Sequence, residues 1–179
     1  MKIADDLLIQ RQELKFHIPF CRLLSTLQMI NQITNSEPLK RDQYQVQNIY
    51  FDTPEAKHFL QKINGEPSRS KYRIRSYSNS KNIFLEKKFL ASGIKYKLRS
   101  LTNLKKLDNF EFMNYLQKLR DPNELELEVR QLIFSDTLSP SLFIGFNRIA
   151  YIYKNELRIT IDDELTTYSC RDLINGRNT

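Results

Sequence analysis

Three cations at alternate positions are the most suggestive chemical feature of this sequence. Lys71, Arg73 and Arg75 alternate with Tyr72 and Ile74, and this spacing places the three cations on one face of a β-strand. Along a strand, such neighbours lie only about 6.6 Å apart. Because like charges at this separation repel one another, the arrangement favours a bound polyanion such as a chain of phosphates.

The charge of the chain is concentrated in the same region. The 179 residues carry a formal net charge of +7. Residues 66–106 contain twelve Lys or Arg against two Glu, whereas residues 121–164 contain four against nine acidic residues. This asymmetry indicates a polyanionic ligand. The alternative is a merely solvated basic surface, but solvated strand faces usually mix Thr, Ser, Lys and Glu.

Strands and amphipathic helices must position these cations. Period-two alternation predicts strands at 11–18, 44–51, 70–77, 83–89 and 93–99, and two more after Pro140 around Arg148 and Arg158. Helical spacing predicts a helix from Pro19 to about Thr34, one capped by Thr53 and ended by Gly65, one over 103–119, and one from Asp121–Pro122 through Phe134. Over residues 124–128 the alternation would also suit a strand.

Each predicted strand has one charged and one apolar face, so we expect an α+β fold in one domain over residues 1–179. An open sheet could simply turn its polar face to water. If the sheet instead closes with its polar faces inward and its helices outside, the cations line a tunnel that binds phosphates strongly. Glu13 and Glu86 fall on the same faces, where they would relieve repulsion or hold a divalent cation.

Several classes of protein are excluded by composition. Four glycines provide no Gly-rich phosphate loop, and two cysteines and two histidines provide neither a disulfide framework nor a zinc or histidine-rich metal site. No apolar run approaches the ~18 residues of a membrane span, and the first residues do not resemble a signal peptide. We therefore expect a cytoplasmic protein without a transmembrane segment.

Seven short motifs, in order along the chain, resemble the VTC domain, the polyphosphate polymerase branch of the triphosphate tunnel metalloenzymes. They are Glu13-x-Lys15-Phe16, residues 48–54 (NIYFDTP), Lys71-x-Arg73-x-Arg75, residues 84–88 (FLEKK), Lys97-x-Arg99, residues 146–150 (FNRIA) and residues 157–162 (LRITID). The resemblance implies an antiparallel β tunnel with a basic lumen. It also implies synthesis of inorganic polyphosphate from ATP with a divalent metal, Mn²⁺ or Mg²⁺.

The resemblance also assigns roles by position. It implies catalytic cations at Arg73, Arg75, Arg148 and Arg158, and substrate-binding residues at Lys15, Lys71, Lys88, Lys97 and Phe146. Glu13 and Glu86 are the predicted metal ligands, although Glu86 could equally pair with Lys88 or Arg75. We interpret Arg11 and Arg99 as rim charges, and residues 50–52 as a strand end and helix cap.

The sequence departs from the family pattern at two places. Phe146 stands where the family usually has Tyr, which removes a hydroxyl that could touch phosphate. After the strand of Arg158 the family has a further strand with a Glu-x-Lys pattern, and residues 173–179 contain none. This predicts a domain truncated at its C-terminus, with an incompletely closed tunnel that a partner chain could complete.

Three functions therefore remain open. The first is polyphosphate synthesis from ATP, and the second is triphosphate hydrolysis by a tunnel-fold hydrolase. The third is a non-catalytic module that binds polyphosphate or another polyanion. Specific binding of nucleic acid is disfavoured, because only Tyr72 and Tyr77 flank the main cationic cluster as stacking aromatics.

Overall fold

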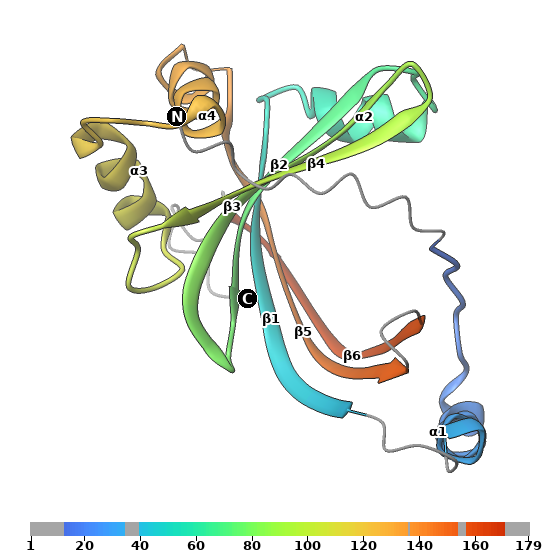
Figure 1. The fold of residues 1–179 in the computed structure, drawn as a ribbon. Helices are drawn as coiled ribbons and strands as arrows, with labels where there is room; N and C mark the ends of the chain where they lie inside the picture. The colour runs from blue at the N-terminus through green and yellow to red at the C-terminus, as the bar shows by residue number, and fades with distance from the viewer. Residues whose placement is uncertain (1–12, 35–39, 136, 154–156, 171–179) are drawn as a thin grey trace.

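The computed structural model describes residues 13–34, 40–135, 137–153 and 157–170 (Figure 1). In this part of the chain the helices are α1 (Phe20–Thr34), α2 (Lys57–Ile63), α3 (Asn109–Lys118) and α4 (Glu124–Phe134). The strands are β1 (Lys40–Asp52), β2 (Arg69–Tyr77), β3 (Ser80–Ala91), β4 (Ile94–Thr102), β5 (Ser139–Tyr153) and β6 (Leu157–Ser169). The predicted α+β class is confirmed.

The six strands form one antiparallel sheet in the order β4-β3-β2-β1-β5-β6. Within the described residues, β4 and β6 are its two edges and do not pair with each other. The sheet is strongly curved and not closed (Figure 1). The expectation of incomplete closure is therefore confirmed.

Apolar side chains on one side of the sheet, the core face, pack against α3 and α4. Ile74 and Leu85 from the strands and Phe112, Leu116 and Val129 from the helices are all fully buried in this cluster. A smaller cluster joins α1 to β5 and β6 through Ile30, Tyr151 and Ile161. In Figure 1, α3 and α4 lie on the core side of the sheet; we call the opposite side of β2–β4 the polar face.

The N-terminal strand prediction is wrong for the residues that can be assessed. Residues 13–19 form neither strand nor helix, and residues 11 and 12 lie outside the described part. Leu14 and Phe16, whose alternation suggested the strand, are each 79% exposed. Alternation makes a strand only where a sheet edge pairs with it, and no strand in the described ranges pairs with this segment.

Three helices begin later than predicted, at Lys57, Asn109 and Glu124. The N-cap of α2 is Ala56; the Thr53 hydroxyl accepts a hydrogen bond from the backbone N–H of Lys57, and the Asp52 carboxylate accepts hydrogen bonds from those of His58 and Phe59. For α3 the N-cap is Asp108. For α4 the N-cap is Asn123, whose side chain forms a reciprocal capping box with Glu126. The capping box also explains why residues 124–128 are helical and not a strand.

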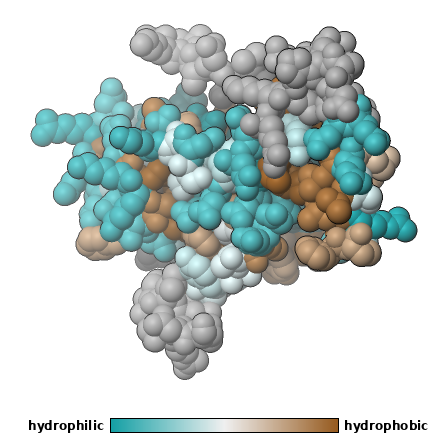
Figure 2. All heavy atoms as spheres, turned by 90° about the horizontal axis from the view of Figure 1, so that it is seen from below, coloured by the Kyte–Doolittle hydropathy of each residue, from teal (hydrophilic) through white to brown (hydrophobic). Residues whose placement is uncertain are grey.

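The surface seen from below carries hydrophilic side chains across its centre and separate hydrophobic patches beside them (Figure 2). Both cysteines are free, Cys21 exposed and Cys170 buried. Among the described helices, none is both long and apolar enough to cross a membrane.

Candidate functional site

The polar face of β2, β3 and β4 carries a cluster of positively charged side chains in matching register. Arg73 lies opposite Glu86, and Glu86 lies opposite Arg99. One step along the strands, Lys71, Lys88 and Lys97 form a row in the same way. We call this set the cation cluster; its members are Lys71, Arg73, Arg75, Lys88, Lys97 and Arg99.

Glu86 lies at the centre of the cation cluster and is completely buried. Its Oε2 accepts hydrogen bonds from Nε of Arg73 at 2.8 Å and from Nη2 at 2.5 Å. Its Oε1 lies 2.8 Å from Nζ of Lys97 and 3.2 Å from Nε of Arg99. Glu86 therefore acts as the counter-ion of three cations from two neighbouring strands.

The pKa of Glu86 reflects this environment. Burial by itself would raise the pKa, but the charges of Arg73, Lys97 and Arg75 outweigh burial and lower the pKa to about 2. The carboxylate is therefore ionised at any physiological pH. It offsets part of the repulsion within the cation cluster, as the sequence suggested for a carboxylate on this face.

Two polar residues of β1 orient the arginines of β2. Nη1 of Arg73 donates a hydrogen bond to the Tyr50 hydroxyl at 2.8 Å. Nε of Arg75 donates to Oδ1 of Asn48 at 2.6 Å, and both of these residues are buried. Sequence reasoning missed Asn48 as a site residue and took Tyr50 only as part of a strand end. Their alternation with Ile49 and Phe51 was the signal that could have placed them on the polar face.

The two lysines nearest the N-terminal segment lose some affinity for their proton. Desolvation lowers the pKa of Lys71, and the charges of Lys62 and Lys15 add to this effect. Desolvation also lowers the pKa of Lys88, followed by the charges of Arg73 and Lys97, while Glu13 and Glu86 act in the opposite direction. A bound anion would raise the pKa of both lysines, because it stabilises their charged forms.

Glu13 and Lys15 thus lie near the cation cluster although they are not in a strand. They form an exposed ion pair of 3.7 Å with each other. Glu13 raises the pKa of Lys88 and Lys15 lowers that of Lys71, so their charges act on two members of the cation cluster.

Arg99, which the sequence suggested to be a surface or rim charge, is exposed on the edge strand β4 and also belongs to the cation cluster. Its Cζ lies 3.5 Å from the ring centroid of Phe84 and its Nη2 donates to the Tyr77 hydroxyl at 3.3 Å. The pattern Lys97-x-Arg99 already placed it on the same face as Lys97. Arg99 therefore links Glu86 and its ion pairs to the aromatic rings of Phe84 and Tyr77.

Arg148 and Arg158 lie on the polar face farther along β1 than the cation cluster. Arg148 is opposite Tyr44, whereas Arg75 and Arg73 are opposite Asn48 and Tyr50, which lie four and six residues away, or about 13 and 20 Å along β1. Arg148 makes two hydrogen bonds to Asp162, of 2.6 and 2.7 Å. Nη2 of Arg158 donates to the Tyr44 hydroxyl at 2.8 Å.

Phe146 lies between these two regions. It is opposite Val46, packs against the cluster of Tyr44, Val46 and Ala150, and has Cζ of Arg148 5.1 Å from its ring centroid. The structure thus brings together Lys71, Arg73, Arg75, Lys88 and Lys97. It places Arg148, Arg158 and Phe146 farther along the same face.

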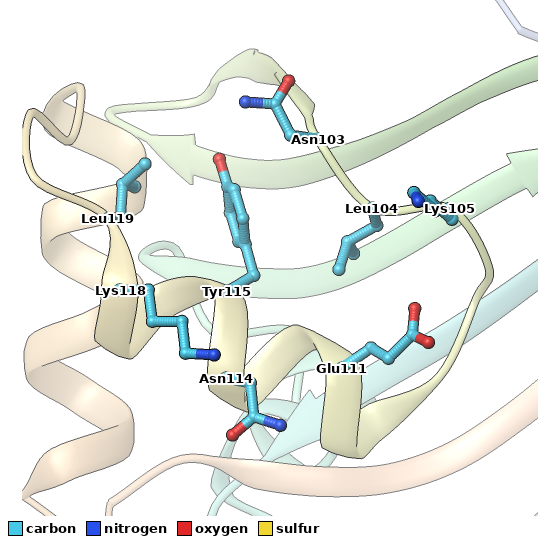
Figure 3. Close-up of a pocket in the computed structure, with 8 residues that line it drawn as sticks. All are labelled: Asn103, Leu104, Lys105, Glu111, Asn114, Tyr115, Lys118 and Leu119. Atoms are coloured by element: carbon cyan, nitrogen blue, oxygen red, sulfur yellow. The ribbon is translucent and has the colours of Figure 1, made fainter.

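Other polar groups that could suggest a site have structural roles. Asp52 caps α2, as the sequence predicted for a residue at this strand end. Glu126 accepts hydrogen bonds from Ser100 and Tyr115 and so fastens α4 to β4 and α3. An open pocket of ≈ 440 Å³ lies beside α3, lined by Asn103, Leu104, Lys105, Glu111, Asn114, Tyr115, Lys118 and Leu119 (Figure 3). None of these residues belongs to the cation cluster.

The implied divalent metal does not fit the described residues as they stand. Both oxygens of Glu86 face cations, and a metal ion would have to displace them. Glu13 is exposed and forms an ion pair with Lys15. In the described ranges no group of three or more His, Cys, Asp or Glu side chains could hold a metal ion. We therefore assign no catalytic step to a protein-held metal.

Comparison with known families settles which family this is. The VTC domain model matches residues 10–177, nearly the whole chain. The chain belongs to the VTC domain family. No curated protein matches the sequence. The resemblance that the seven motifs indicated is thereby confirmed.

Solved structures similar to the VTC domain described here have low sequence identity. One is a candidate adenylate cyclase from Vibrio parahaemolyticus, with 11% identity, a TM-score of 0.44, and coverage of 87% of this chain and 76% of that one. A candidate adenylyl cyclase from Hippeastrum, described as having a dominant triphosphatase activity, has 15% identity, a TM-score of 0.45, and coverage of 85% and 78%. The PH1819 protein from Pyrococcus horikoshii has 11% identity, a TM-score of 0.40, and coverage of 83% and 77%.

Proposed function

We propose that this VTC domain binds ATP and inorganic polyphosphate on its polar face and transfers the γ-phosphoryl group of ATP to the growing chain. One observation carries the proposal: six cations lie together on the polar face, and three of them share the buried carboxylate of Glu86. Because the cations of this cluster outnumber the carboxylates beside them among the described residues, the cluster has charge left to neutralise a triphosphate.

The proposed reaction needs little covalent chemistry from the protein. A terminal oxygen of the polyphosphate attacks the γ-phosphorus, the bond from this phosphorus to the β,γ-bridging oxygen breaks, and ADP leaves. Cations that hold the phosphates in line and neutralise the developing charge supply most of the rate in such transfers. Lys97 and Arg99 are suited to this task because they are 43% and 37% exposed and can exchange Glu86 for phosphate.

Arg73 has a different place in the proposal. Its side chain is 9% exposed and contacts both Glu86 and Tyr50. Three of the five N–H groups of a guanidinium are used in these hydrogen bonds. We infer that Arg73 contributes its charge and holds the other groups in place, while the more exposed cations make most of the contacts to phosphate.

Product analysis tests the proposal. Purified protein is incubated with ATP and Mn²⁺ or Mg²⁺, and products are resolved on a gel that separates long polyphosphate from free phosphate. We expect long chains from the wild type and from Lys106→Ala, an exposed residue paired with Glu111 on the side of α3. We expect none from Lys97→Ala or Arg73→Ala.

The other outcomes identify the remaining functions. Free phosphate without long chains would replace the proposal with triphosphate hydrolysis. Binding of polyphosphate by a folded protein without turnover would favour the non-catalytic module. A partner chain that completes the open sheet stays part of the proposal, and activity that appears only on adding such a partner would support it.

A further inference from the structure

Aromatic side chains continue the polar face directly beyond the cation cluster. The rings of Tyr77 and Phe84 meet edge to face with centroids 6.2 Å apart. Tyr77 also meets Tyr44 edge to face at 5.7 Å. Phe146 packs against the same group from β5. These rings give the polar face an aromatic region that adjoins the basic one.

Arg99 is part of both regions. Its Nε lies 3.2 Å from Glu86 in the cation cluster, while its Cζ lies 3.5 Å from the centroid of Phe84. The hydrogen bond to Tyr77 holds the other end of the guanidinium. Held at these points against one ring, the side chain is still 37% exposed, so a ligand can reach part of it.

Arg75 makes a second connection between the two regions. Asn48 holds its Nε, and its Cζ lies 5.8 Å from the centroid of Tyr77. Its charge also contributes to the low pKa of Glu86. A ligand with phosphates among the cations and a planar group attached to them would therefore find both surfaces in one continuous stretch of the sheet.

We propose that the stack of Arg99 on Phe84, with Tyr77 beside it, is a subsite for the base of a nucleoside triphosphate. The inference rests on the proposed function, because it takes the cation cluster to hold the phosphates. Bases stack on aromatic rings and on guanidinium planes. A base stacked on Arg99 lies next to phosphates bound by Lys97, so the subsite distinguishes a nucleotide from a bare phosphate chain.

The subsite does not choose strongly between bases. Stacking recognises a π-face that every base has. The hydroxyls of Tyr77 and Tyr44 already accept hydrogen bonds from Arg99 and Arg158. We therefore expect ATP and GTP to bind with affinities within about threefold of each other.

Binding of matched ligands to the full chain tests this inference. ATP, GTP and ribose 5-triphosphate are titrated calorimetrically at one ionic strength and one Mg²⁺ concentration. Ribose 5-triphosphate has the same phosphate ester as ATP but no base. We expect ATP to bind about tenfold more tightly, which is the size of one base stack. In Phe84→Leu this ratio should fall to about two while ribose 5-triphosphate binds as before.

Phe89→Leu is the matched control. Phe89 lies on the same strand but on the other face, where it stacks on Tyr96 with centroids 4.9 Å apart and has Nζ of Lys87 4.9 Å from its own centroid. The ratio for ATP over ribose 5-triphosphate should stay as in the wild type. If Phe84→Leu does not fold, Arg99→Lys serves instead, since it keeps the charge and removes the plane, and it should lower the ratio too.

Three results would overturn the inference, and they differ in what they leave of the proposed function. Equal affinity of the wild type for ATP and ribose 5-triphosphate would exclude a base subsite and leave the proposed function standing. The same follows if Phe84→Leu weakens both ligands equally, because Phe84 would then only position Arg99 for phosphate. If no triphosphate binds, the proposed function fails together with the inference.

Discussion

The residue that organises this site is a buried carboxylate surrounded by cations. Glu86 has no exposed surface and meets Arg73, Lys97 and Arg99 at distances between 2.5 and 3.2 Å. Removal of one partner of a buried ion pair lowers the stability of the fold strongly, because the charge left behind has neither water nor a partner. Glu86 therefore holds the cation cluster together in the absence of a ligand.

Replacing Glu86 tests this role. We expect Glu86→Gln to lower the free energy of unfolding by about 3 kcal/mol at low salt, because the cations lose their counter-ion. Added tripolyphosphate should then raise the melting temperature of the variant by more than that of the wild type, since the anion takes the place of the carboxylate. Urea and thermal unfolding with and without tripolyphosphate measure both effects.

A control substitution at an exposed ion pair shows whether the loss of any acidic residue lowers the free energy of unfolding to the same extent. Glu111 pairs with Lys106 at 3.6 Å on the surface, so Glu111→Gln should change stability by less than about 0.5 kcal/mol. If Glu86→Gln is equally mild and tripolyphosphate stabilises it no more than the wild type, Glu86 is not the counter-ion of the cluster.

The pKa of Glu86 predicts how stability depends on pH. The cluster lowers this pKa from 4.5 to about 2 in the folded protein. A group whose pKa is lower in the folded state stabilises the fold above its unfolded pKa and loses this contribution as the pH falls through the folded one. Stability should therefore decrease between about pH 4.5 and pH 2. Urea unfolding across this range should show a clearly smaller decrease for Glu86→Gln than for the wild type.

At the scale of elements, a turn and a short helix follow the strand that carries Asn48 and Tyr50. Asp52 ends β1 and its carboxylate accepts hydrogen bonds from the backbone of Thr53, His58 and Phe59. Asp52 is buried, which could be mistaken for a catalytic position. Its partners are all backbone N–H groups at the start of α2, so its role is to fix the chain after β1.

Substitution of Asp52 distinguishes capping from catalysis. Asp52→Ala should lower the free energy of unfolding by about 1–2 kcal/mol, as loss of a helix cap does, and leave the affinity for tripolyphosphate unchanged within error. Glu55→Ala, an exposed neighbour, should change neither quantity. An Asp52→Ala protein of near-normal stability that no longer binds or turns over triphosphate would place Asp52 in the site.

Elements also show where sequence patterns were sufficient. Alternation located β2, β3 and β4 because both faces of each strand are distinct: Ile74 and Leu85 are fully buried on one side, while Arg73 and Glu86 share the other. It misjudged residues 13–18, because alternation reports amphipathicity and not the presence of a pairing edge. Helix starts were displaced because the N-caps of α3 and α4 are Asp108 and Asn123, which lie later in the chain than the predicted starts.

At the scale of the whole molecule, the sheet gathers six cations on the polar face of β2–β4. The sequence could predict which residues share a face, but not how far apart they lie across the sheet. The register of β5 with β1 places Arg148 opposite Tyr44, about 20 Å along the strand from Tyr50, the partner of Arg73. The register of β5 with β6 places it opposite Asp162, to which it donates two hydrogen bonds. The sequence also could not predict the partners of Glu86, because these depend on the register of β4 against β3.

The curved, open sheet determines which cations a ligand can reach. Lys97 and Arg99 come from β4, an edge strand within the described residues, and their side chains are partly exposed, whereas Arg73 comes from the interior of the sheet and is buried. The account therefore divides the cluster into cations that contact phosphate and cations that support them. Its central claim is that this face of the sheet binds a chain of phosphates.

The most direct measurement is the affinity of the full chain for tripolyphosphate in two variants of adjacent lysines. Lys88 lies in the cation cluster, whereas Lys87 lies on the opposite face, 2.6 Å from Glu128. We expect Lys88→Ala to weaken binding about tenfold, the loss of one charge-assisted contact, and Lys87→Ala to leave the affinity unchanged. Equal affinities in the wild type and both variants, or a loss only in Lys87→Ala, would contradict the assignment of the polar face as the phosphate site.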